Sequence, residues 1–391
     1  MHCQKHLFDI PADITYLNCA RRGPQSKKLA EIGITAIQKQ CRPFAFSNEE
    51  FFQPIEQVKQ KFSRLIDNDD PGRIALIPSA SYGLANVAKN IHLKKGEKII
   101  IAEEQFPSNV YPWMKIADKS GGQLEIVGAT DKNNRGASWN QALLAAIDDQ
   151  TKLIALGNVH WTDGTLFKLA EISAKAKKHG ALLIIDGTQS VGALPFSVKT
   201  IQPDALICGS YKWMMGPYSM GLAYYGPAFD QGEPIEENWI NRLNSHDFTN
   251  LVNYQPLYRP KAQRYSMGEQ SNFILLPLLS AALDQLNAWG VENIQSYCRK
   301  ISKKQIDELM DMGLHLEQEE YRGDHLFGVR LNDQIDGVRL KSLLEKDKIL
   351  VSFRGTAMRV SPNVYNEEAD LEKLVRCIKN SRKKSAAILN V

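Results

Sequence analysis

Short apolar runs alternate with longer amphipathic stretches up to about residue 230 of the chain. Each run is apolar almost throughout and only a few residues long, which predicts strands that are buried on both faces. The runs occupy residues 73–77, 98–102, 153–157, 181–185, 205–209 and 221–225. Amphipathic stretches between them predict helices at residues 82–91, 138–147 and 167–178. This alternation is typical of an α/β fold with a mostly parallel sheet flanked by helices.

The pattern changes in the last part of the chain. Residues 232–262 are polar and predict loops, and a long apolar stretch at 272–289 predicts a connecting helix despite Pro277. Helices are then predicted at 293–312 and 368–382, and strands near 325–331 and 349–353. We therefore expect an N-terminal arm (1–20), a large α/β domain (21–260) and a smaller α+β C-terminal region (261–391).

Composition narrows the classes of protein that the chain can belong to. Of its 391 residues 43% are hydrophobic and 24% are charged, as in a soluble globular protein. The net charge of +4 is spread along the chain and predicts no binding to nucleic acid. The longest apolar stretch, 273–283, is too short to span a membrane. The six cysteines show no CxxC spacing, which predicts reduced thiols in a cytoplasmic protein and no metal site.

Two residues suggest a cofactor chemistry, because each follows a predicted buried strand. Asp186 ends one apolar run and Lys212 comes shortly after another, and in parallel sheets ligands bind beyond such strand ends. An amine can hold an aldehyde as an imine, and a carboxylate can keep a ring nitrogen protonated. Pyridoxal 5′-phosphate (PLP) is bound in this way. Taken singly, Asp186 is better explained as a helix cap, and Lys212 is explained equally well as a surface lysine.

A phosphate site is suggested by Ser79-Ala80-Ser81-Tyr82-Gly83, which follows a predicted strand and begins a helix. The N–H groups of a helix N-terminus and a serine hydroxyl favour an anion, although an ordinary serine cap explains the same pattern. No GxGxxG follows a predicted strand, which argues against a nicotinamide-binding enzyme.

Four segments in order resemble the class V aminotransferase family, a group of PLP-dependent enzymes that includes cysteine desulfurases, kynureninases and isopenicillin N epimerase-like proteins. They are Gln-Phe-Pro-Ser-Asn (105–109), Asp-Gly-Thr-Gln (186–189), Ser-Tyr-Lys-Trp (210–213) and Met-Arg-Val-Ser-Pro-Asn-Val-Tyr-Asn (358–366). The resemblance runs from Tyr16 to near residue 375. It implies the PLP-dependent transferase fold type I, PLP as cofactor, and a homodimer.

The resemblance implies a role for each matched residue around the cofactor ring. Lys212 matches the lysine that forms the Schiff base, and Asp186 matches the acid that pairs with the pyridine nitrogen. Gln189 matches the residue that hydrogen-bonds the phenolic oxygen. Phe106 lies where the family stacks a ring on the face of PLP. His160 lies on a loop where the family often places a polar contact to the cofactor, although a structural histidine is an equal alternative.

Other matched residues concern the phosphate and the substrate. The Ser81 hydroxyl and the backbone of Ala80 and Tyr82 match the phosphate site, and Ser210 and Tyr211 match phosphate-side residues of the kynureninase-like branch.

Arg359 matches the arginine that grips the substrate α-carboxylate, for which its planar fork is suited. Many relatives have a threonine that contacts the phosphate of the cofactor in the partner subunit. This chain has Glu269 at that position, so the resemblance does not establish that contact here.

The positions of the cysteines narrow the reactions that the resemblance allows. A cysteine desulfurase of the persulfide type needs a cysteine shortly before the carboxylate-binding arginine, and residues 335–358 contain none. The sequence therefore predicts a PLP-dependent aminotransferase acting on an amino acid or amine, in which Lys212 removes the Cα proton. An epimerase or a C–S lyase of the same family is the alternative, and a non-catalytic binding protein derived from the fold is a further one.

Overall fold

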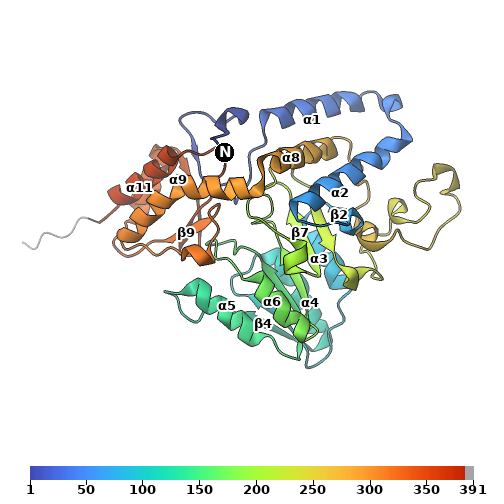
Figure 1. Cartoon of the computed structure of the whole chain (residues 1–391), viewed down its shortest axis with the longest axis horizontal. Helices are drawn as coiled ribbons and strands as arrows, with labels where there is room; N and C mark the ends of the chain where they lie inside the picture. Colours follow the sequence, from blue (N-terminus) through green and yellow to red (C-terminus); the bar gives the residue numbers. More distant parts are fainter. Residues whose placement is uncertain (384–391) are drawn as a thin grey trace, which may run out of the picture.

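A seven-stranded sheet forms the centre of the computed structural model, which describes residues 1–383 (Figure 1). The strand order is β2-β8-β7-β6-β5-β3-β4, and all strands run in the same direction except β8. The strands are β2 (Ile74–Ile77), β3 (Lys98–Ala102), β4 (Gln123–Val127), β5 (Thr151–Gly157), β6 (Leu182–Asp186), β7 (Ala205–Gly209) and β8 (Gly221–Tyr225). The predicted fold class, a mostly parallel sheet flanked by helices, is confirmed.

Both faces of this sheet are covered, which is why its strands are apolar throughout. Along β3, Ile100 belongs to one core cluster, while Ile99 and Ile101 belong to the other. The alternation follows from the two-residue period of a strand, which turns successive side chains to opposite faces. The helices of this part are α1 (Lys27–Gln40), α2 (Gln53–Leu65), α3 (Ala80–Lys89), α4 (Tyr111–Ser120), α5 (Arg135–Ala146), α6 (Leu169–Lys178) and α7 (Val198–Ile201).

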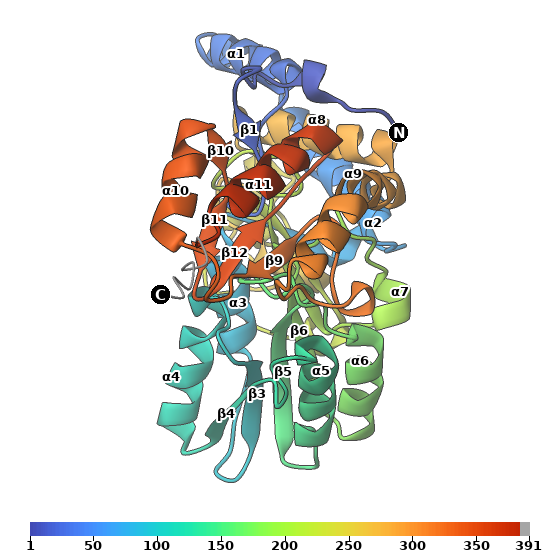
Figure 2. The ribbon, with the colours of Figure 1, turned by 90° about the vertical axis from the view of Figure 1, so that its left-hand side faces the viewer.

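The C-terminal part has its own small sheet and core (Figure 2). The sheet is antiparallel with the order β11-β12-β9, and it lies above the large sheet in the view of Figure 2. The strands of the C-terminal part are β9 (Phe327–Arg330), β10 (Ile349–Leu350), β11 (Ser352–Arg354) and β12 (Ala357–Val360). Its helices are α8 (Leu275–Trp289), α9 (Val291–Asp311), α10 (Gly337–Lys346) and α11 (Glu368–Asn380). Residues 384–391 of the predicted C-terminal region lie outside the described residues.

Several elements differ from the sequence-based expectation. Pro277 falls in the first turn of α8, where a missing N–H costs no helical hydrogen bond. The strand predicted at 349–353 is two strands, β10 and β11, which belong to different sheets. The edge strand β4 was not predicted, because its side chains are partly exposed and form no continuous apolar run. Helices α1, α2, α4 and α10 were not predicted either.

The N-terminal segment joins the C-terminal part rather than the large sheet. The short strand β1 (Thr15–Tyr16) pairs in parallel with β10, and Leu17 is fully buried in the small core. The chain then passes the loop after β7, where the Gly23 N–H donates to the Tyr211 carbonyl oxygen at 2.9 Å. The predicted division into an arm, a large domain and a smaller C-terminal region stays a prediction.

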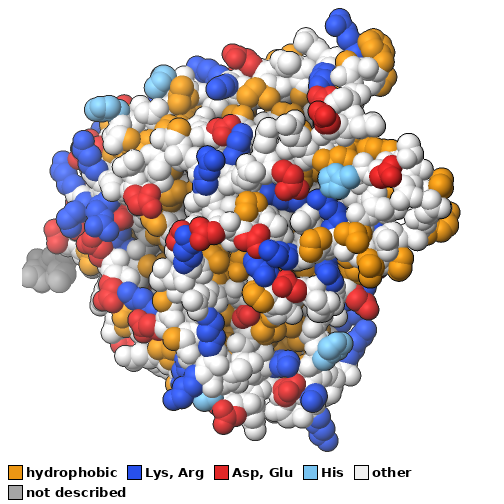
Figure 3. Space-filling view, turned by 45° about the vertical axis from the view of Figure 1, so that its right-hand side comes forward, with side chains coloured by type: hydrophobic (Ala, Val, Ile, Leu, Met, Phe, Trp, Pro, Cys, Tyr) orange, Lys and Arg blue, Asp and Glu red, His pale blue; other side chains and the backbone are white. Residues whose placement is uncertain are grey.

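The segment between residues 232 and 262 projects from the body of the molecule (Figure 1) and contains only short 3-10 turns. Hydrophobic side chains are exposed on this side (Figure 3), among them Val252, Tyr254 and Leu257. Within residues 1–383, no helix combines the length and the apolar character needed to cross a bilayer.

Candidate active site

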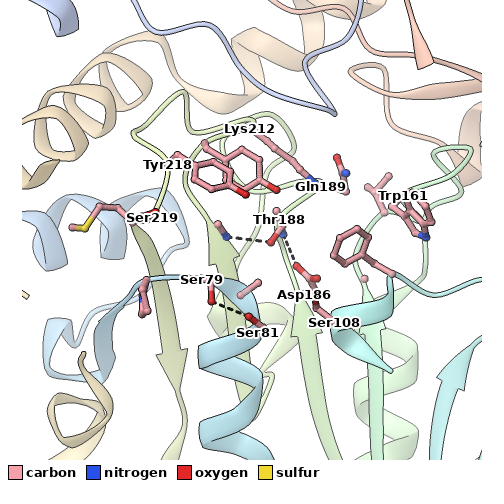
Figure 4. Close-up of a pocket in the computed structure, with 18 of the residues that line it drawn as sticks. Ser79, Ser81, Ser108, Trp161, Asp186, Thr188, Gln189, Lys212, Tyr218 and Ser219 are labelled. Atoms are coloured by element: carbon pink, nitrogen blue, oxygen red, sulfur yellow. Dashed lines mark hydrogen bonds between the residues drawn. The ribbon is translucent and has the colours of Figure 1, made fainter. Parts of the chain in front are cut away.

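A cavity of about 290 Å³ lies at the carboxyl ends of the central strands (Figure 4). The last residues of β5, β6 and β7, namely Gly157, Asp186 and Gly209, line it. The start of α3, the loop after β3 and the loop after β7 complete the wall. Since these loops come from separate parts of the sequence, the parallel sheet is what brings their side chains together.

Lys212 reaches this cavity from the loop after β7. It is only 7% exposed, and its Nζ lies 5.5 Å from the ring centroids of both Phe106 and Tyr211. The pKa of its amine is lowered to about 8, mainly by burial; Asp186 opposes this shift, and the positive charge of Arg359 contributes to it. A substantial fraction of the amine is therefore neutral near physiological pH, and only a neutral amine is a nucleophile.

Asp186 is oriented by the turn that follows its strand. One carboxylate oxygen, Oδ1, accepts the N–H of Thr188 at 2.9 Å. The Thr188 hydroxyl in turn accepts the N–H of Gly209 at 3.1 Å, which ties β6 to β7 (Figure 4). Among the lining residues that the structure describes, Asp186 is the only acid. Its carboxylate is the group of this cavity that can pair with a protonated ring nitrogen.

Gln189 is held by contacts with distant segments. Its side-chain nitrogen donates to the Ala20 carbonyl oxygen at 3.1 Å, and its oxygen accepts the indole N–H of Trp213 at 3.1 Å. The His325 Nε2 lies 2.9 Å from the Gln189 carbonyl oxygen, and burial lowers the pKa of His325 to about 4, so this imidazole is neutral. The amide of Gln189 keeps a second N–H that can donate to a ligand in the cavity.

The start of α3 offers an anion site on the same cavity. Ser79, Ala80 and Ser81 line it, and the hydroxyls of Ser79 and Ser81 lie 2.9 Å apart (Figure 4). The first N–H groups of a helix have no helical partner, and they point toward ligands at this end. The N–H of Tyr82 donates to the Ser79 hydroxyl, and the Tyr82 phenol donates to Glu236 at 2.8 Å. Tyr82 itself does not line the cavity.

Like Tyr82, Ser210 and His160 have predicted cofactor contacts but do not line the cavity. Ser210 is fully buried, and its hydroxyl is within 2.8 Å of the Pro217 and Met220 carbonyl oxygens. The ring of His160 lies 2.8 Å from the Thr162 hydroxyl and 3.1 Å from the carbonyl oxygen of Glu103.

Tyr211, by contrast, lines the cavity, and its ring packs edge-on against Tyr218 with centroids 4.7 Å apart. Tyr218 and Ser219 line it as well, although no motif in the sequence marks them.

Two aromatic side chains, Phe106 and Trp161, form another part of the cavity wall. Phe106 packs edge-on against Trp161 with ring centroids 5.4 Å apart, and the Trp161 indole N–H donates to the Glu104 carbonyl oxygen at 2.7 Å. Both residues line the cavity, and Trp161 is labelled in Figure 4. Trp161 was not predicted as a site residue, although it directly follows His160. Gln105 and Ser108, next to Phe106, were also missed and line the cavity.

Arg359 lies on β12 of the small sheet, beside the cavity. Its side chain is 1% exposed, one N–H donates to the Trp161 carbonyl oxygen at 2.7 Å, and Nε has no hydrogen-bond partner. Burial lowers the pKa of this guanidinium to about 10, and the charge of Arg354 adds to that effect. A buried N–H without a partner is unfavourable, so the arrangement fits a carboxylate ligand.

Together, these groups suit three parts of one ligand. The start of α3 suits an anion, Phe106 and Asp186 suit an aromatic ring with a protonated nitrogen, and Lys212 suits a carbonyl carbon. Glu269, whose role the sequence left open, is exposed, with a left-handed backbone at φ +53°.

Comparison with known proteins agrees with this geometry. A family model described as Aminotransferase class-V matches residues 42–377. The uncharacterized aminotransferase YcbU of Bacillus subtilis is 24% identical over 351 residues, which are 89% of this chain and 90% of YcbU. A cysteine desulfurase of Salmonella typhimurium is 24% identical over 261 residues, which are 66% of this chain and 62% of that enzyme.

A solved structure shares the fold. The complex of the cystine C–S lyase C-DES with its reaction product, cysteine persulfide, superposes with a TM-score of 0.84 at 19% identity. The superposition covers 95% of this chain and 99% of the lyase chain. In another structure of C-DES, glycine is covalently linked to the PLP cofactor.

Proposed function

Because the chain belongs to the class V aminotransferase family, whose fold and cofactor PLP it shares, we propose that it is an aminotransferase that acts on an amino acid. The observation that carries this proposal is one cavity that joins a buried lysine with a lowered pKa, Lys212, to a single acid, Asp186. When bound, PLP supplies an aldehyde carbon that an amine can attack and a ring that accepts the electrons released at Cα.

Three residues of this chain have separate roles in the proposed reaction. Asp186 holds a proton on the ring nitrogen through the carboxylate oxygen that Thr188 leaves free. Lys212 would hold the cofactor's aldehyde covalently, and its neutral Nζ would accept the Cα proton of the substrate. Arg359 binds the α-carboxylate with the N–H that has no protein partner.

Contacts around the ring and the phosphate follow the same logic. Gln189 donates its second N–H to the phenolic oxygen, and Phe106 covers one face of the ring and excludes water. Ser81 and the first N–H groups of α3 bind the phosphate. Tyr211 adds a contact at the cavity, whereas Ser210 and His160 act by fixing the loops from behind.

The position of the thiols supports transamination over persulfide transfer. No cysteine lines the cavity in the described part of the chain. The Cys19 Sγ lies 3.9 Å from the Lys212 carbonyl oxygen, yet it is fully buried behind the backbone, and burial raises its pKa to about 11. A thiol in that state is a poor nucleophile. An epimerase or a C–S lyase of the same family remains the alternative, and a non-catalytic binding protein is the further one. A homodimer in the cytoplasm stays a prediction.

Spectroscopy with PLP tests the proposal. Purified protein incubated with PLP is expected to show an imine absorbance, and borohydride should trap the adduct on Lys212, located by peptide mass. Lys212→Ala should lose the adduct, while Lys341→Ala, at an exposed lysine of α10, should keep it. An absence of both absorbance and adduct in the natural protein would sink the proposal.

An amino-acid screen with the loaded protein then separates the reactions. Keto-acid production that depends on an added keto-acid acceptor and releases no ammonia supports transamination. Exchange of the α-proton for deuterium without keto acid indicates an epimerase. Cleavage of cystine to cysteine persulfide, with pyruvate and ammonia, indicates a C–S lyase. A stable adduct that turns over no amino acid in any of these assays would favour the non-catalytic alternative.

A further inference from the structure

A second arginine shares the site with Arg359, and strand geometry places both on one face. β11 and β12 form an antiparallel pair in which Ser352 faces Arg359 and Arg354 faces Ala357. Side chains two residues apart on a strand point to the same face, and directly opposed residues do so as well. Arg354 and Arg359 are therefore diagonal neighbours on the same face of this hairpin.

Both guanidinium groups contact Trp161, which lines the cavity. Arg359 donates to the Trp161 carbonyl oxygen at 2.7 Å, and the guanidinium carbon of Arg354 lies 5.6 Å from the centroid of the Trp161 ring. Neither arginine lines the cavity itself, but both contact Trp161, which does, so both stand at its border. The charges of both also lower the pKa of Lys212, which places them within electrostatic reach of the reacting amine.

These two charges differ from a third arginine on the same face. Arg330 on β9 lies opposite Ala357, and it is neutralised by the buried Asp163 at 2.6 Å. Within residues 1–383, no carboxylate lies within 4.0 Å of Arg354 or Arg359. Arg354 has one hydrogen bond, to the neighbouring Phe353 carbonyl oxygen. The cavity border thus carries two positive charges that have no anionic partner in the protein.

We propose that the substrate is an amino acid with a second anionic group, and that Arg354 binds this group while Arg359 binds the α-carboxylate. The inference rests on the proposed function. One carboxylate satisfies one planar guanidinium in the bidentate manner, so two adjacent guanidinium groups suit a ligand with two anionic ends. Dicarboxylic amino acids such as aspartate and glutamate are the simplest members of this class.

The rival arrangement has both arginines on one α-carboxylate. In that case every amino acid would use Arg354 equally, whatever its side chain. The two arrangements differ in the ratio of kcat/KM between dicarboxylic and monocarboxylic substrates, because a shared α-carboxylate contributes to both and cancels in the ratio.

The experiment compares L-aspartate and L-glutamate with L-alanine on PLP-loaded protein whose Lys212 adduct has been verified beforehand. Binding of succinate and glutarate, against propionate and butyrate, is measured by titration calorimetry as a readout that needs no turnover. We expect the natural protein to favour the dicarboxylic member of each pair by about 10- to 100-fold, the range of one charged hydrogen-bonding pair. Arg354→Gln should abolish that preference, and Arg354→Lys should keep part of it.

Arg339→Gln is the matched control, because it removes one exposed positive charge from α10 at a residue that does not line the cavity, and it should keep the full preference. A natural protein without the preference overturns the inference, as does an Arg354→Gln protein that weakens both substrate classes equally. If the Lys212 adduct forms and the preference is absent, this inference alone fails. If no adduct forms, the proposed function fails and the inference falls with it.

Discussion

At the residue scale, burial makes the Lys212 amine a better nucleophile but lowers the stability of the cofactor-free protein. Burial lowers the pKa of this amine to about 8, although Asp186 acts in the opposite direction. The unfolded chain would hold the same proton up to a pKa of about 10.4. Folding therefore makes protonation of this amine less favourable, which aids its role as a nucleophile and destabilises the protein without cofactor.

A methionine in place of Lys212 should stabilise the cofactor-free protein. Between pH 8 and pH 10.5 the unfolded chain binds more protons at this position than the folded one, so the penalty is full below pH 8 and shrinks as the pH rises. We expect Lys212→Met to raise the free energy of unfolding by about 3 kcal/mol at pH 7 and by less than about 1 kcal/mol at pH 10. Urea unfolding at the two pH values measures this.

Lys341→Met, at an exposed lysine, should change the free energy of unfolding little at either pH. An equal gain for Lys212→Met at both pH values would show that packing, not the charge of the amine, is responsible.

At the scale of elements, the N-terminal segment and the loop after β7 are in close contact. A Cβ atom at Gly23 would lie 2.0 Å from the Lys212 carbonyl oxygen, and the Gly23 N–H donates to Tyr211. Only a residue without a side chain permits this approach. The contact fixes the backbone from which Lys212 extends into the cavity.

Gly23→Ala should therefore displace one of these two segments. We expect a loss of about 1–3 kcal/mol in the free energy of unfolding, as in overpacked sites, together with slower formation of the Lys212 adduct. Gly337→Ala is the control, because nothing lies within 4 Å of the added methyl group at the start of α10. That variant should be neutral or stabilised by up to about 1 kcal/mol. Normal adduct formation in Gly23→Ala would contradict the positioning role.

At the scale of the whole molecule, Asp163 joins the large sheet to the small one. It lies on the loop after β5 and pairs with Arg135 of α5 at 3.0 Å and with Arg330 of β9 at 2.6 Å. Burial alone would raise its pKa. The hydrogen bond with His160 and the two arginine charges outweigh burial and hold the pKa of Asp163 below its usual range. His160 thus has a structural part in this junction, whatever it contributes to the cofactor.

Asp163→Asn should weaken the junction, because it removes the acid that pairs with the partly exposed Arg330 and leaves Arg135 only Glu104, 3.3 Å away. We expect a loss of about 1.5–3 kcal/mol in the free energy of unfolding at pH 7, the range of a hydrogen bond to a charged group, measured by urea denaturation. The stabilisation from Asp163 is present above its unfolded pKa of about 3.9 and is lost as the pH falls, so the difference between the two proteins should shrink in acid. Asp333→Asn, at an exposed position, should have little effect. A loss that stays constant in acid would rule out the ionic origin.

Residue patterns by themselves determined the family, the cofactor and the central strands. Continuous apolar runs mark strands that are buried on both faces, and a residue at the end of such a strand lies at the ligand-binding edge whatever the rest of the chain does. Asp186 and Lys212 could therefore be selected from local sequence, and Gln189 from the resemblance to the family; all three line the cavity. Edge strand β4 and helices such as α1 lack a comparably strong local pattern, and they were missed.

Only the tertiary structure decided which neighbouring side chains face the cavity. Ser210 and His160 stand next to lining residues in the sequence, yet carbonyl oxygens and a hydroxyl from other segments hold them behind the wall. Trp161 lies on the loop after β5 and contacts two arginines of the small sheet, Arg359 and Arg354. Only the tertiary structure brings these segments together. The physical reason is that local pattern sets the strand and its end. The direction of each side chain there depends on hydrogen-bond and charge partners that are distant in sequence.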